Sequence, residues 1–272
     1  MTLVDTSNLL NALAALARRA GDEVMAIYAG DFTVLKKADA SPVTQADVLA
    51  EALIVQGLRT LTPHIPIVAE EAVARGDVPR VGMGVDDLFW LVDALDGTRE
   101  FIHRNGEFTV NIALVQGGVP VCGVVLAPAL SRLYGGALRL GAFVEDGLKD
   151  GGVRHVIRCR ETPLEGMTVL ASRSHGDEGA LRGFLAGRRV AEVVHAGSSL
   201  KLCVIAAGLA DMYPRLGRTM AWDIAAGHAV LLAAGGTVND LTGAPLRYGH
   251  AGFENPHFVA GGCGCGGGCA DS

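Results

Sequence analysis

The segment LVDALDGTREF, residues 91–101, places two aspartates directly after an apolar run. The run LFWLV (88–92) consists of large apolar side chains and therefore predicts a strand that is buried on both faces. Asp93 and Asp96 follow, and the Gly-Thr pair behind them predicts a turn into a short helix. Buried carboxylates are costly unless hydrogen bonds or cations compensate their charge. Taken alone, the segment fits a capped turn as well as it fits a cation site.

Two more acidic sites lie at the ends of expected elements. Glu70 and Glu71 follow the apolar run IPIVA (65–69), and Asp223 lies at the start of a helical pattern over 221–236. Strand ends and helix starts are where α/β proteins place ligands. Converging carboxylates would repel one another, and a pair of hard divalent cations would remove that repulsion. An all-oxygen set favours Mg²⁺, and the lack of His and Cys within these motifs disfavours zinc.

Helical and strand periodicities predict a mixed α/β (α+β) fold. We expect helices over 6–29, between the cap Thr44 and Pro63, and over 176–187, 199–210 and 221–236. We expect strands at 65–71, 88–94, 108–116, 119–128, 132–138, 141–146, 167–172, 190–197 and 211–216. The strands between 108 and 146 predict an antiparallel meander, whereas strands and helices alternate later in the chain. The predicted parts are an α+β half (1–159), an α/β half (160–262) and a Gly/Cys-rich tail (263–272), whose composition opposes order.

The composition of the 272-residue chain limits its partners and its location. A net charge of −6 disfavours a nucleic-acid polymer, which requires a basic face. The amino terminus has no basic residue before Arg18, unlike a signal peptide. Polar residues, Gly and Pro interrupt the longest apolar region (110–130), unlike a membrane span. We expect a cytoplasmic protein, with a peripheral position at the inner face of the cell membrane as an alternative; the oligomeric state is left open.

The six cysteines fall into two groups. Three lie in apolar segments and are expected to be core thiols, namely Cys122, Cys159 and Cys203. The other three, Cys263, Cys265 and Cys269, belong to the tail. A soft-metal or redox role for the tail is an alternative, but no paired CxxC or nearby His completes a zinc set.

The acidic motifs together resemble a known family. EE at 70–71, DALDGTREF at 93–101 and WD at 222–223 resemble the inositol monophosphatase superfamily of Mg²⁺-dependent, lithium-sensitive phosphatases. SPVTQAD (41–47), NGEFTVNIAL (105–114), SRSH (172–175) and GSSLKLCVIAAGLADMYPRLG (197–217) resemble its CysQ branch, the 3′(2′),5′-bisphosphate nucleotidases. The resemblance implies a layered α-β-α-β-α sandwich. One letter departs from the pattern, because Ala94 stands where the family usually has Pro.

The resemblance implies two Mg²⁺ ions. Glu70, Asp93 and the backbone carbonyl of Leu95 would hold the first. Asp93 would also contact the second, which Asp96 and Asp223 complete. A weaker third ion near Glu70 is an open alternative.

The resemblance also implies a catalytic pair and a phosphate site. Thr98 and Asp47 would orient the attacking water or help to deprotonate it, with Glu70 as the further catalytic residue. From the sequence alone, Asp47 also fits a solvated first-turn acid that favours the helix dipole. The N–H groups of Gly97 and Thr98 would bind the phosphate at a helix start.

Substrate selection is expected from the C-terminal half. Substrate contacts are predicted for Glu70, Leu95, Asp96, Gly97, Thr98, Asp223, Gly197, Ser198, Lys201 and Arg215. Gly197, Ser198 and Ser199 precede a helix whose N-terminus could take a second phosphate, and Lys201 and Arg215 are candidate charges for a 5′-phosphate. A cap, a solvated lysine and a surface arginine are equally good interpretations. Three further candidates are Lys37 near the metal loop and His175 and His228 near a base, although packing histidines are favoured.

The resemblance implies an enzyme that removes the 3′-phosphate of adenosine 3′,5′-bisphosphate (PAP), giving AMP and phosphate. This reaction would clear a by-product of sulfate assimilation, and 3′-phosphoadenylyl sulfate is a second candidate substrate. One alternative is an inositol monophosphatase or another sugar phosphatase on the same fold. Another is a catalytically weak metal- or nucleotide-binding protein, which the complete acidic set disfavours.

Overall fold

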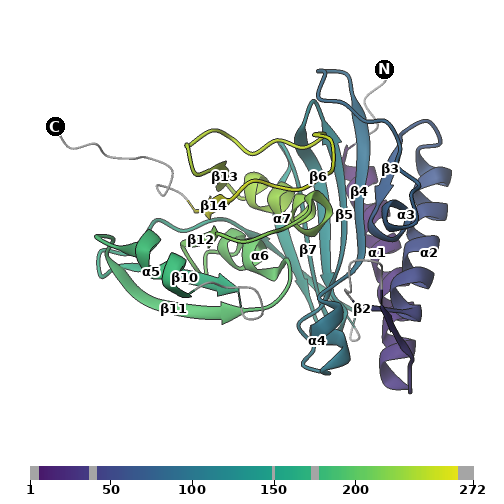
Figure 1. Cartoon of the computed structure of the whole chain (residues 1–272), viewed down its shortest axis with the longest axis horizontal. Helices are drawn as coiled ribbons and strands as arrows, with labels where there is room; N and C mark the ends of the chain where they lie inside the picture. Colours follow the sequence, from purple (N-terminus) through teal and green to yellow (C-terminus); the bar gives the residue numbers. More distant parts are fainter. Residues whose placement is uncertain (1–5, 37–41, 149–150, 173–177, 263–272) are drawn as a thin grey trace.

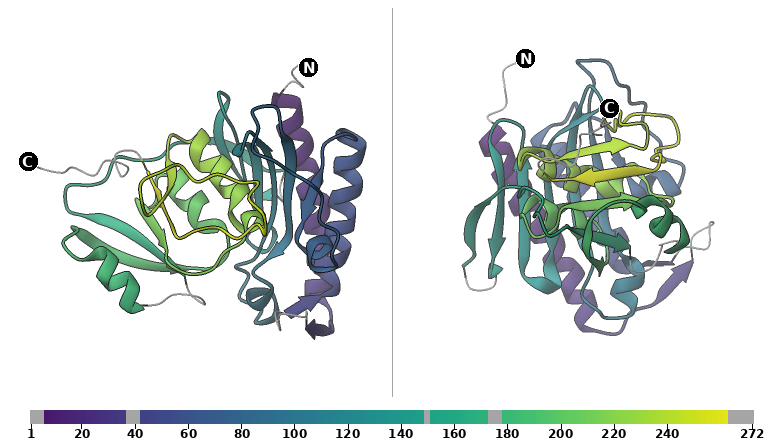
Figure 2. Two further views of the ribbon diagram at one scale, coloured as in Figure 1. Left: turned by 45° about the horizontal axis from the view of Figure 1, so that its top comes forward. Right: turned by 90° about the vertical axis from the view of Figure 1, so that its left-hand side faces the viewer.

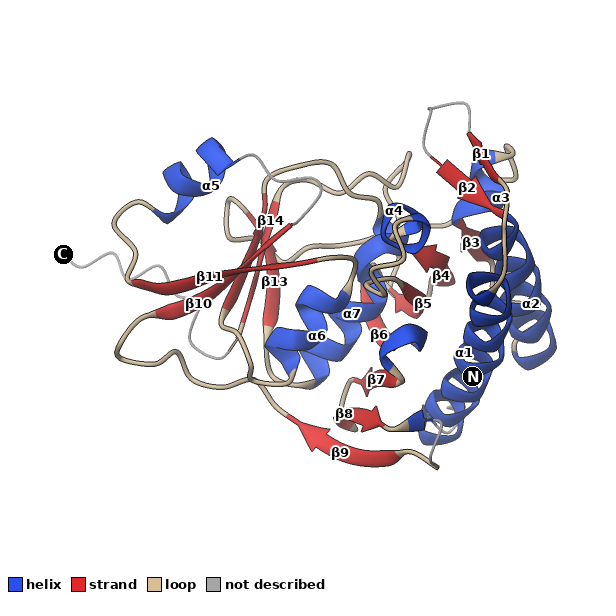
Figure 3. Ribbon diagram, turned by 90° about the horizontal axis from the view of Figure 1, so that it is seen from below, coloured by secondary structure: helices blue, strands red, loops and turns tan. Residues whose placement is uncertain are grey.

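The computed structural model describes residues 6–36, 42–148, 151–172 and 178–262. Its helices and sheets stack in five layers (Figure 1; Figure 3). The layered α-β-α-β-α sandwich predicted from the sequence is thus confirmed. In order across the molecule these layers are α1 (Thr6–Ala29) with α2 (Gln45–Leu61), a seven-stranded sheet, α6 (Leu200–Ala206) with α7 (Ala221–Ala233), a five-stranded sheet, and α5 (Glu178–Leu185). The left-hand view of Figure 2 shows the same order.

The seven-stranded sheet has the order β3-β4-β5-β6-β7-β8-β9. Its strands are β3 (Ile67–Ala69), β4 (Leu88–Asp96), β5 (Thr109–Gln116), β6 (Val119–Ala127), β7 (Arg132–Ala137), β8 (Gly141–Asp146) and β9 (Val153–Ile157). Only β3 and β4 pair in parallel, and the predicted antiparallel meander from β5 to β8 is confirmed. The edge strand β9 was not predicted, because it buries a single residue and so carries no apolar alternation.

The five-stranded sheet has the order β11-β10-β12-β14-β13. Its strands are β10 (Met167–Ser172), β11 (Val190–Ala196), β12 (Met212–Arg215), β13 (Thr237–Asp240) and β14 (Phe258–Gly261). β10 runs parallel to β11 and β12, whereas β14 is antiparallel to β12 and β13. The sequence predicted neither β13 nor β14. Each has four residues, too few to show a period, and each is a strand through pairing with distant segments.

Short elements near the site differ from expectation. The strand predicted over 65–71 ends at Ala69, and both glutamates behind it begin α3 (Glu70–Ala74). Residues predicted as loop include β2 (Pro42–Thr44), which pairs with β1 (Val34–Lys36). The remaining short elements are α4 (Thr98–Ile102) and the 3₁₀ turn η1 (Pro128–Leu130). Among the described helices, none combines the length and apolar character needed to span a membrane.

Helix α7 lies directly against the seven-stranded sheet and carries Asp223 in its first turn. Two strand glycines permit this approach. A Cβ at Gly123 would lie 2.7 Å from the Ala226 carbonyl oxygen, and one at Gly136 would lie 2.7 Å from the Val230 Cα. Because α7 is buried on almost every side, its sequence is apolar all round. This packing holds the start of α7 beside the end of β4.

Candidate functional site

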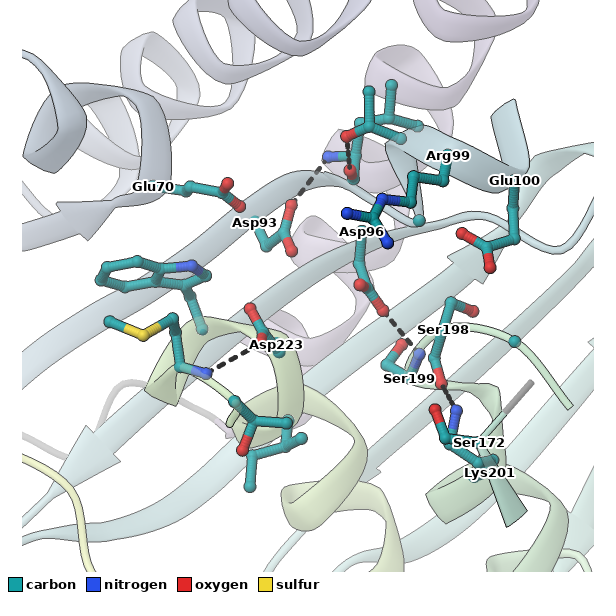
Figure 4. Close-up of a pocket in the computed structure, with 18 of the residues that line it drawn as sticks. Glu70, Asp93, Asp96, Arg99, Glu100, Ser172, Ser198, Ser199, Lys201 and Asp223 are labelled. Atoms are coloured by element: carbon teal, nitrogen blue, oxygen red, sulfur yellow. Dashed lines mark hydrogen bonds between the residues drawn. The ribbon is translucent and has the colours of Figure 1, made fainter. Parts of the chain in front are cut away.

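A cavity of about 520 Å³ opens where β4, α3, α4, α6 and α7 meet (Figure 4). Its walls contain residues from both halves of the chain. Glu70, Asp93 and Asp96 line it from the N-terminal half, and Ser199 and Asp223 line it from the C-terminal half. The three acidic motifs that are far apart in sequence therefore converge on one cavity.

Three carboxylates form the centre of this cavity. Glu70 at the start of α3, Asp93 on β4 and Asp223 near the start of α7 each offer an oxygen, and these atoms lie within 4.8 Å of one another. Figure 4 shows the three side chains pointing toward a common point. The Met220 N–H donates to Asp223 at 2.8 Å, which caps α7 and fixes this carboxylate.

A β-bulge explains how Asp93 and Asp96 reach the same cavity. Residues three apart on a regular strand point to opposite faces. In the β4–β5 ladder, Asp93 pairs with Asn111 and Asp96 with Thr109, so β4 contains one extra residue. Ala94 is buried within this bulge, and Asp93 and Asp96 both line the cavity.

The protein environment raises the pKa of three of the aspartates that line the cavity. Burial raises the pKa of Asp93 well above its usual range, and Glu70, Asp96 and Asp223 raise it further. Burial together with Asp96 and Glu70 also raises the pKa of Asp223. Burial raises the pKa of Asp96 to about 6, although Lys201 opposes this shift. The converging oxygens of Glu70, Asp93 and Asp223, together with the raised pKa values of the two aspartates, fit a hard divalent cation such as Mg²⁺.

The predicted pair of Asp47 and Thr98 is in contact. The Thr98 hydroxyl donates to Asp47 at 3.1 Å, across 51 residues of sequence. Asp47 is buried, and its other oxygen accepts from the N–H and the hydroxyl of Thr44, each at 2.7 Å. Asp47 therefore caps α2 and contacts Thr98 at once, and the expectation of a solvated side chain is wrong because Asp47 is buried. Its catalytic role stays a prediction.

The residues predicted to contact phosphate all line the cavity, but some of their hydrogen-bond donors are already bonded within the protein. Gly97 lines the cavity with a left-handed φ of 89°. Gly197 and Ser198 also line it, in the turn that precedes α6. Lys201 and Arg215 line it too, but both are buried, and their side-chain donors already reach backbone or side-chain oxygens of the protein. Their predicted contact with a phosphate stays a prediction.

The structure shows where several other predicted residues lie. His228 is a packing histidine, since its Nδ1 lies 2.9 Å from the Tyr248 hydroxyl and the ring is buried. The core positions of Cys122 and Cys203 are confirmed, whereas Cys159 is only partly buried. Lys37, His175 and the three tail cysteines lie outside the described residues.

Sequence reasoning named Ser199 but missed the polar residues that it contacts. The Ser199 N–H donates to Asp96 at 2.6 Å, and the Ser199 hydroxyl lies 2.8 Å from that of Thr109 and 2.7 Å from the side-chain Oδ1 of Asn111. Exposed Arg99 and Arg218 at the cavity edge were also missed. The polar residues Thr109 and Asn111, inside the buried strand β5, were the available signal for the first group.

Comparisons with known proteins agree with this geometry. A model of the inositol monophosphatase family matches residues 5–260. The 3′(2′),5′-bisphosphate nucleotidase CysQ of Escherichia coli (strain K12) is 46% identical over 255 residues, 92% of this chain and 98% of that protein. The CysQ of Buchnera aphidicola subsp. Acyrthosiphon pisum is 38% identical over 257 residues, 93% of each chain.

Solved structures give the same assignment. CysQ from Bacteroides thetaiotaomicron, described as a bacterial member of the inositol monophosphatase family, matches with a TM-score of 0.78 at 36% identity, covering 96% of this chain and 99% of that chain. The IMPase of Thermotoga maritima matches with a TM-score of 0.76 at 27% identity, covering 93% and 92%. With its acidic motifs assembled in one cavity and its similarity extending over nearly the whole chain, this protein belongs to the inositol monophosphatase family.

Proposed function

We propose that this protein is a 3′(2′),5′-bisphosphate nucleotidase that removes the 3′-phosphate of PAP, giving AMP and phosphate. The observation that carries the proposal is the 46% identity to CysQ nucleotidases over 92% of the chain, in a structure whose acidic motifs converge. A second substrate for the same reaction is 3′-phosphoadenylyl sulfate, which also carries a 3′-phosphate. A cytoplasmic location belongs to the same proposal, and cell fractionation would test it.

We expect the site to hold two Mg²⁺ ions, and the cluster of the Glu70, Asp93 and Asp223 carboxylates supports this expectation. We expect Glu70, Asp93 and the Leu95 carbonyl at one ion, and Asp93, Asp96 and Asp223 at the other. A third, weaker ion near Glu70 remains an alternative. When bound, Mg²⁺ supplies the positive charge that stabilises a phosphoryl group during in-line transfer.

The chain's own groups then position the water and accept its proton. Thr98 lines the cavity, and its hydroxyl donates to Asp47 at 3.1 Å or to the Leu95 carbonyl at 3.3 Å, so its oxygen lone pairs are available to a water molecule in either case. Asp47 is held by Thr44 and cannot turn away from Thr98 without breaking the α2 cap. The pair thus orients the attacking water and offers a path for its proton, while the phosphate lies against the Gly97 and Thr98 N–H groups.

The second candidate is an inositol or sugar phosphatase. It is favoured by the 27% identity and shared fold of the Thermotoga maritima IMPase. The nucleotidase has the stronger support, because the CysQ relatives are more similar over an equal share of the chain. In the nucleotidase, we expect Gly197, Ser198, Lys201 and Arg215 to form the side of the cavity that faces the second phosphate.

A substrate panel tests the proposal. The purified full chain is assayed with Mg²⁺ on PAP, 3′-phosphoadenylyl sulfate and inositol 1-phosphate, with and without Li⁺, and released phosphate is measured. We expect the highest kcat/KM on PAP and inhibition by Li⁺. Faster release from inositol 1-phosphate than from PAP would establish the second candidate instead.

A further inference from the structure

Glu51 is a buried carboxylate on α2 and is not among the described residues that line the cavity. It lies one helical turn after Asp47, so both side chains leave the same face of α2. Each of the two acids is only 3% exposed. Asp47 contacts Thr98 on α4, whereas the Glu51 carboxylate contacts α3, the helix that begins with Glu70. Helix α2 therefore carries two buried acids, and each contacts an element that lines the site.

Glu51 supplies a cap that α3 lacks locally. The first N–H groups of a helix have no partner within the helix, and a side-chain oxygen of the preceding residue commonly accepts from one of them. Ala69 precedes α3 and makes no side-chain cap. Instead, Oε2 of Glu51 accepts from the Glu71 N–H at 2.7 Å, across 20 residues of sequence. The other carboxylate oxygen lies 3.4 Å from a guanidinium nitrogen of Arg75, so one side chain contacts both ends of α3.

This contact fixes the main chain at Glu70. Glu70 is the first residue of α3, and its carboxylate points toward Asp93 at the centre of the cavity (Figure 4). The N–H that donates to Glu51 belongs to the peptide group that joins Glu70 to Glu71. Because a peptide group is planar and moves as a unit, the hydrogen bond restricts the backbone of Glu70 and with it the direction of its side chain. Glu71 is buried, so loss of this partner inside the protein would be costly.

We propose that Glu51 is a positioning residue for Glu70: by capping α3 from α2, it orients the Glu70 carboxylate for divalent-cation binding, without contacting the cation or the substrate. The proposal rests on the metal role of Glu70 in the proposed function. Outer groups that orient a metal ligand commonly change metal affinity about 10–100-fold when they are removed. A residue with a structural role alone would change the stability of the protein and leave its metal affinity unchanged.

A double-mutant cycle between Glu51→Met and Glu70→Ala tests the proposal. Glu51→Met keeps a side chain of similar length and removes both acceptor oxygens. The Mg²⁺ affinity of the full chain is measured by calorimetry without substrate. We expect a loss of about tenfold in Glu51→Met, in a binding step that Glu70→Ala also weakens. In the Glu70→Ala background, Glu51→Met should cause little further loss, because the ligand that Glu51 positions is already absent.

Two further variants separate positioning from general stability. Glu51→Gln keeps an oxygen that can accept from the Glu71 N–H, although more weakly than a carboxylate, and should lose less Mg²⁺ affinity than Glu51→Met. Asp211→Ala is the matched control, because Asp211 is also a buried carboxylate that accepts a main-chain N–H at 2.7 Å, from Thr168, and pairs with an arginine. In the part of the chain that the structure describes, Asp211 lies outside the cavity lining. Its removal should lower Tm in a chelator and leave Mg²⁺ affinity unchanged.

Unchanged Mg²⁺ affinity in Glu51→Met, or an equal loss in the wild-type and Glu70→Ala backgrounds, would overturn the proposal. If Glu51→Met does not fold, the same cycle is measured with Glu51→Gln, and unchanged affinity in that variant would overturn it equally. Glu70→Ala alone distinguishes this result from a failure of the proposed function. Wild-type Mg²⁺ affinity in Glu70→Ala would refute the metal role of Glu70, whereas a loss there without a loss in Glu51→Met would refute only the positioning role.

Discussion

Thr98 donates its hydroxyl hydrogen to Asp47 at 3.1 Å and so joins α4, beside the acidic cavity, to the first turn of α2. The contact orients the Thr98 hydroxyl and leaves its oxygen lone pairs available to a water molecule in the cavity. It also couples the helix cap of α2 to the geometry of the site. The two functions can be separated by substitutions at Thr98, which leave the Thr44–Asp47 cap intact.

Thr98→Ala should lower kcat by roughly 10²-fold or more, because water loses its orienting group. Thr98→Ser keeps the hydroxyl and should retain most of the activity. Both are measured as phosphate release from PAP at saturating Mg²⁺, with Mg²⁺ affinity determined separately. A Thr98→Ala protein with wild-type kcat would contradict the proposed role of the pair.

Asp93→Asn should stabilise the metal-free protein at neutral pH. The folded-state pKa of Asp93 is raised, so the folded state binds more protons than the unfolded state above pH 3.8. The contribution of Asp93 to stability therefore falls as pH rises from 3.8 toward its folded pKa, and asparagine removes this loss. Tm is measured in a chelator from pH 5 to 8. The advantage of the variant should grow with pH, by about 2–4 °C for each kcal/mol gained.

The matched control is Asp240→Asn, at an aspartate in an exposed turn. Its Tm difference from wild type should not grow over this pH range. Added Mg²⁺ should reverse the order, raising Tm in the wild type more than in Asp93→Asn. A constant difference between wild type and Asp93→Asn from pH 5 to 8 would show that the carboxylate is compensated within the protein.

His228 should make the fold acid-sensitive. Burial lowers the pKa of this ring to about 3. The unfolded chain binds a proton below about pH 6.5 that the folded chain does not, so stability is complete above 6.5 and is lost as pH falls toward 3. The loss is about 1.4 kcal/mol for each pH unit well below 6.5.

His228→Gln should therefore lose less stability than the wild type between pH 7 and pH 5, as measured by urea unfolding. It should also be less stable at pH 7, because the contact with the Tyr248 hydroxyl is altered. His155→Gln, at an exposed position on β9, is the control and should match the acid dependence of the wild type. Equal acid dependence in wild type and His228→Gln would exclude His228 as the cause.

Gly123→Ala should destabilise the protein by about 1–3 kcal/mol, the range for overpacked cores. Its new Cβ would lie 2.7 Å from the Ala226 carbonyl oxygen and 2.9 Å from the Ala229 Cβ, which forces α7 away from the sheet. Gly183→Ala in α5 meets nothing within 4 Å and should be neutral or slightly stabilising. Urea unfolding of both variants compares the two effects. A neutral Gly123→Ala would mean that α7 can shift without cost.

Local chemical patterns accounted for the strongest predictions from sequence. The apolar run of β4 is buried as expected, and the acids behind it converge with Glu70 and Asp223. These features can be predicted because they depend on the hydrophobicity and charge of residues that are adjacent in the sequence. The catalytic roles assigned to the acids are untested and rest on family membership.

Features that depend on contacts between distant segments could not be predicted from the sequence. The bulge at Ala94 exists only relative to β5, and β14 is a strand because β12 and β13 lie beside it. Ser199 likewise contacts Asp96 through a turn whose left-handed residue is not glycine. The residue types in such a turn do not predict its backbone conformation, because the stabilising contacts come from elsewhere in the chain.

The most direct test of the central claim is turnover of PAP by Asp93→Asn, with Mg²⁺ binding measured on the same sample. Asp93 lies at the centre of the carboxylate cluster, so the substitution removes one charge from the proposed metal site while keeping the shape of the side chain. We predict a folded protein that binds Mg²⁺ far more weakly and releases no measurable phosphate. Wild-type turnover in the folded variant would contradict the proposed metal-dependent phosphatase site.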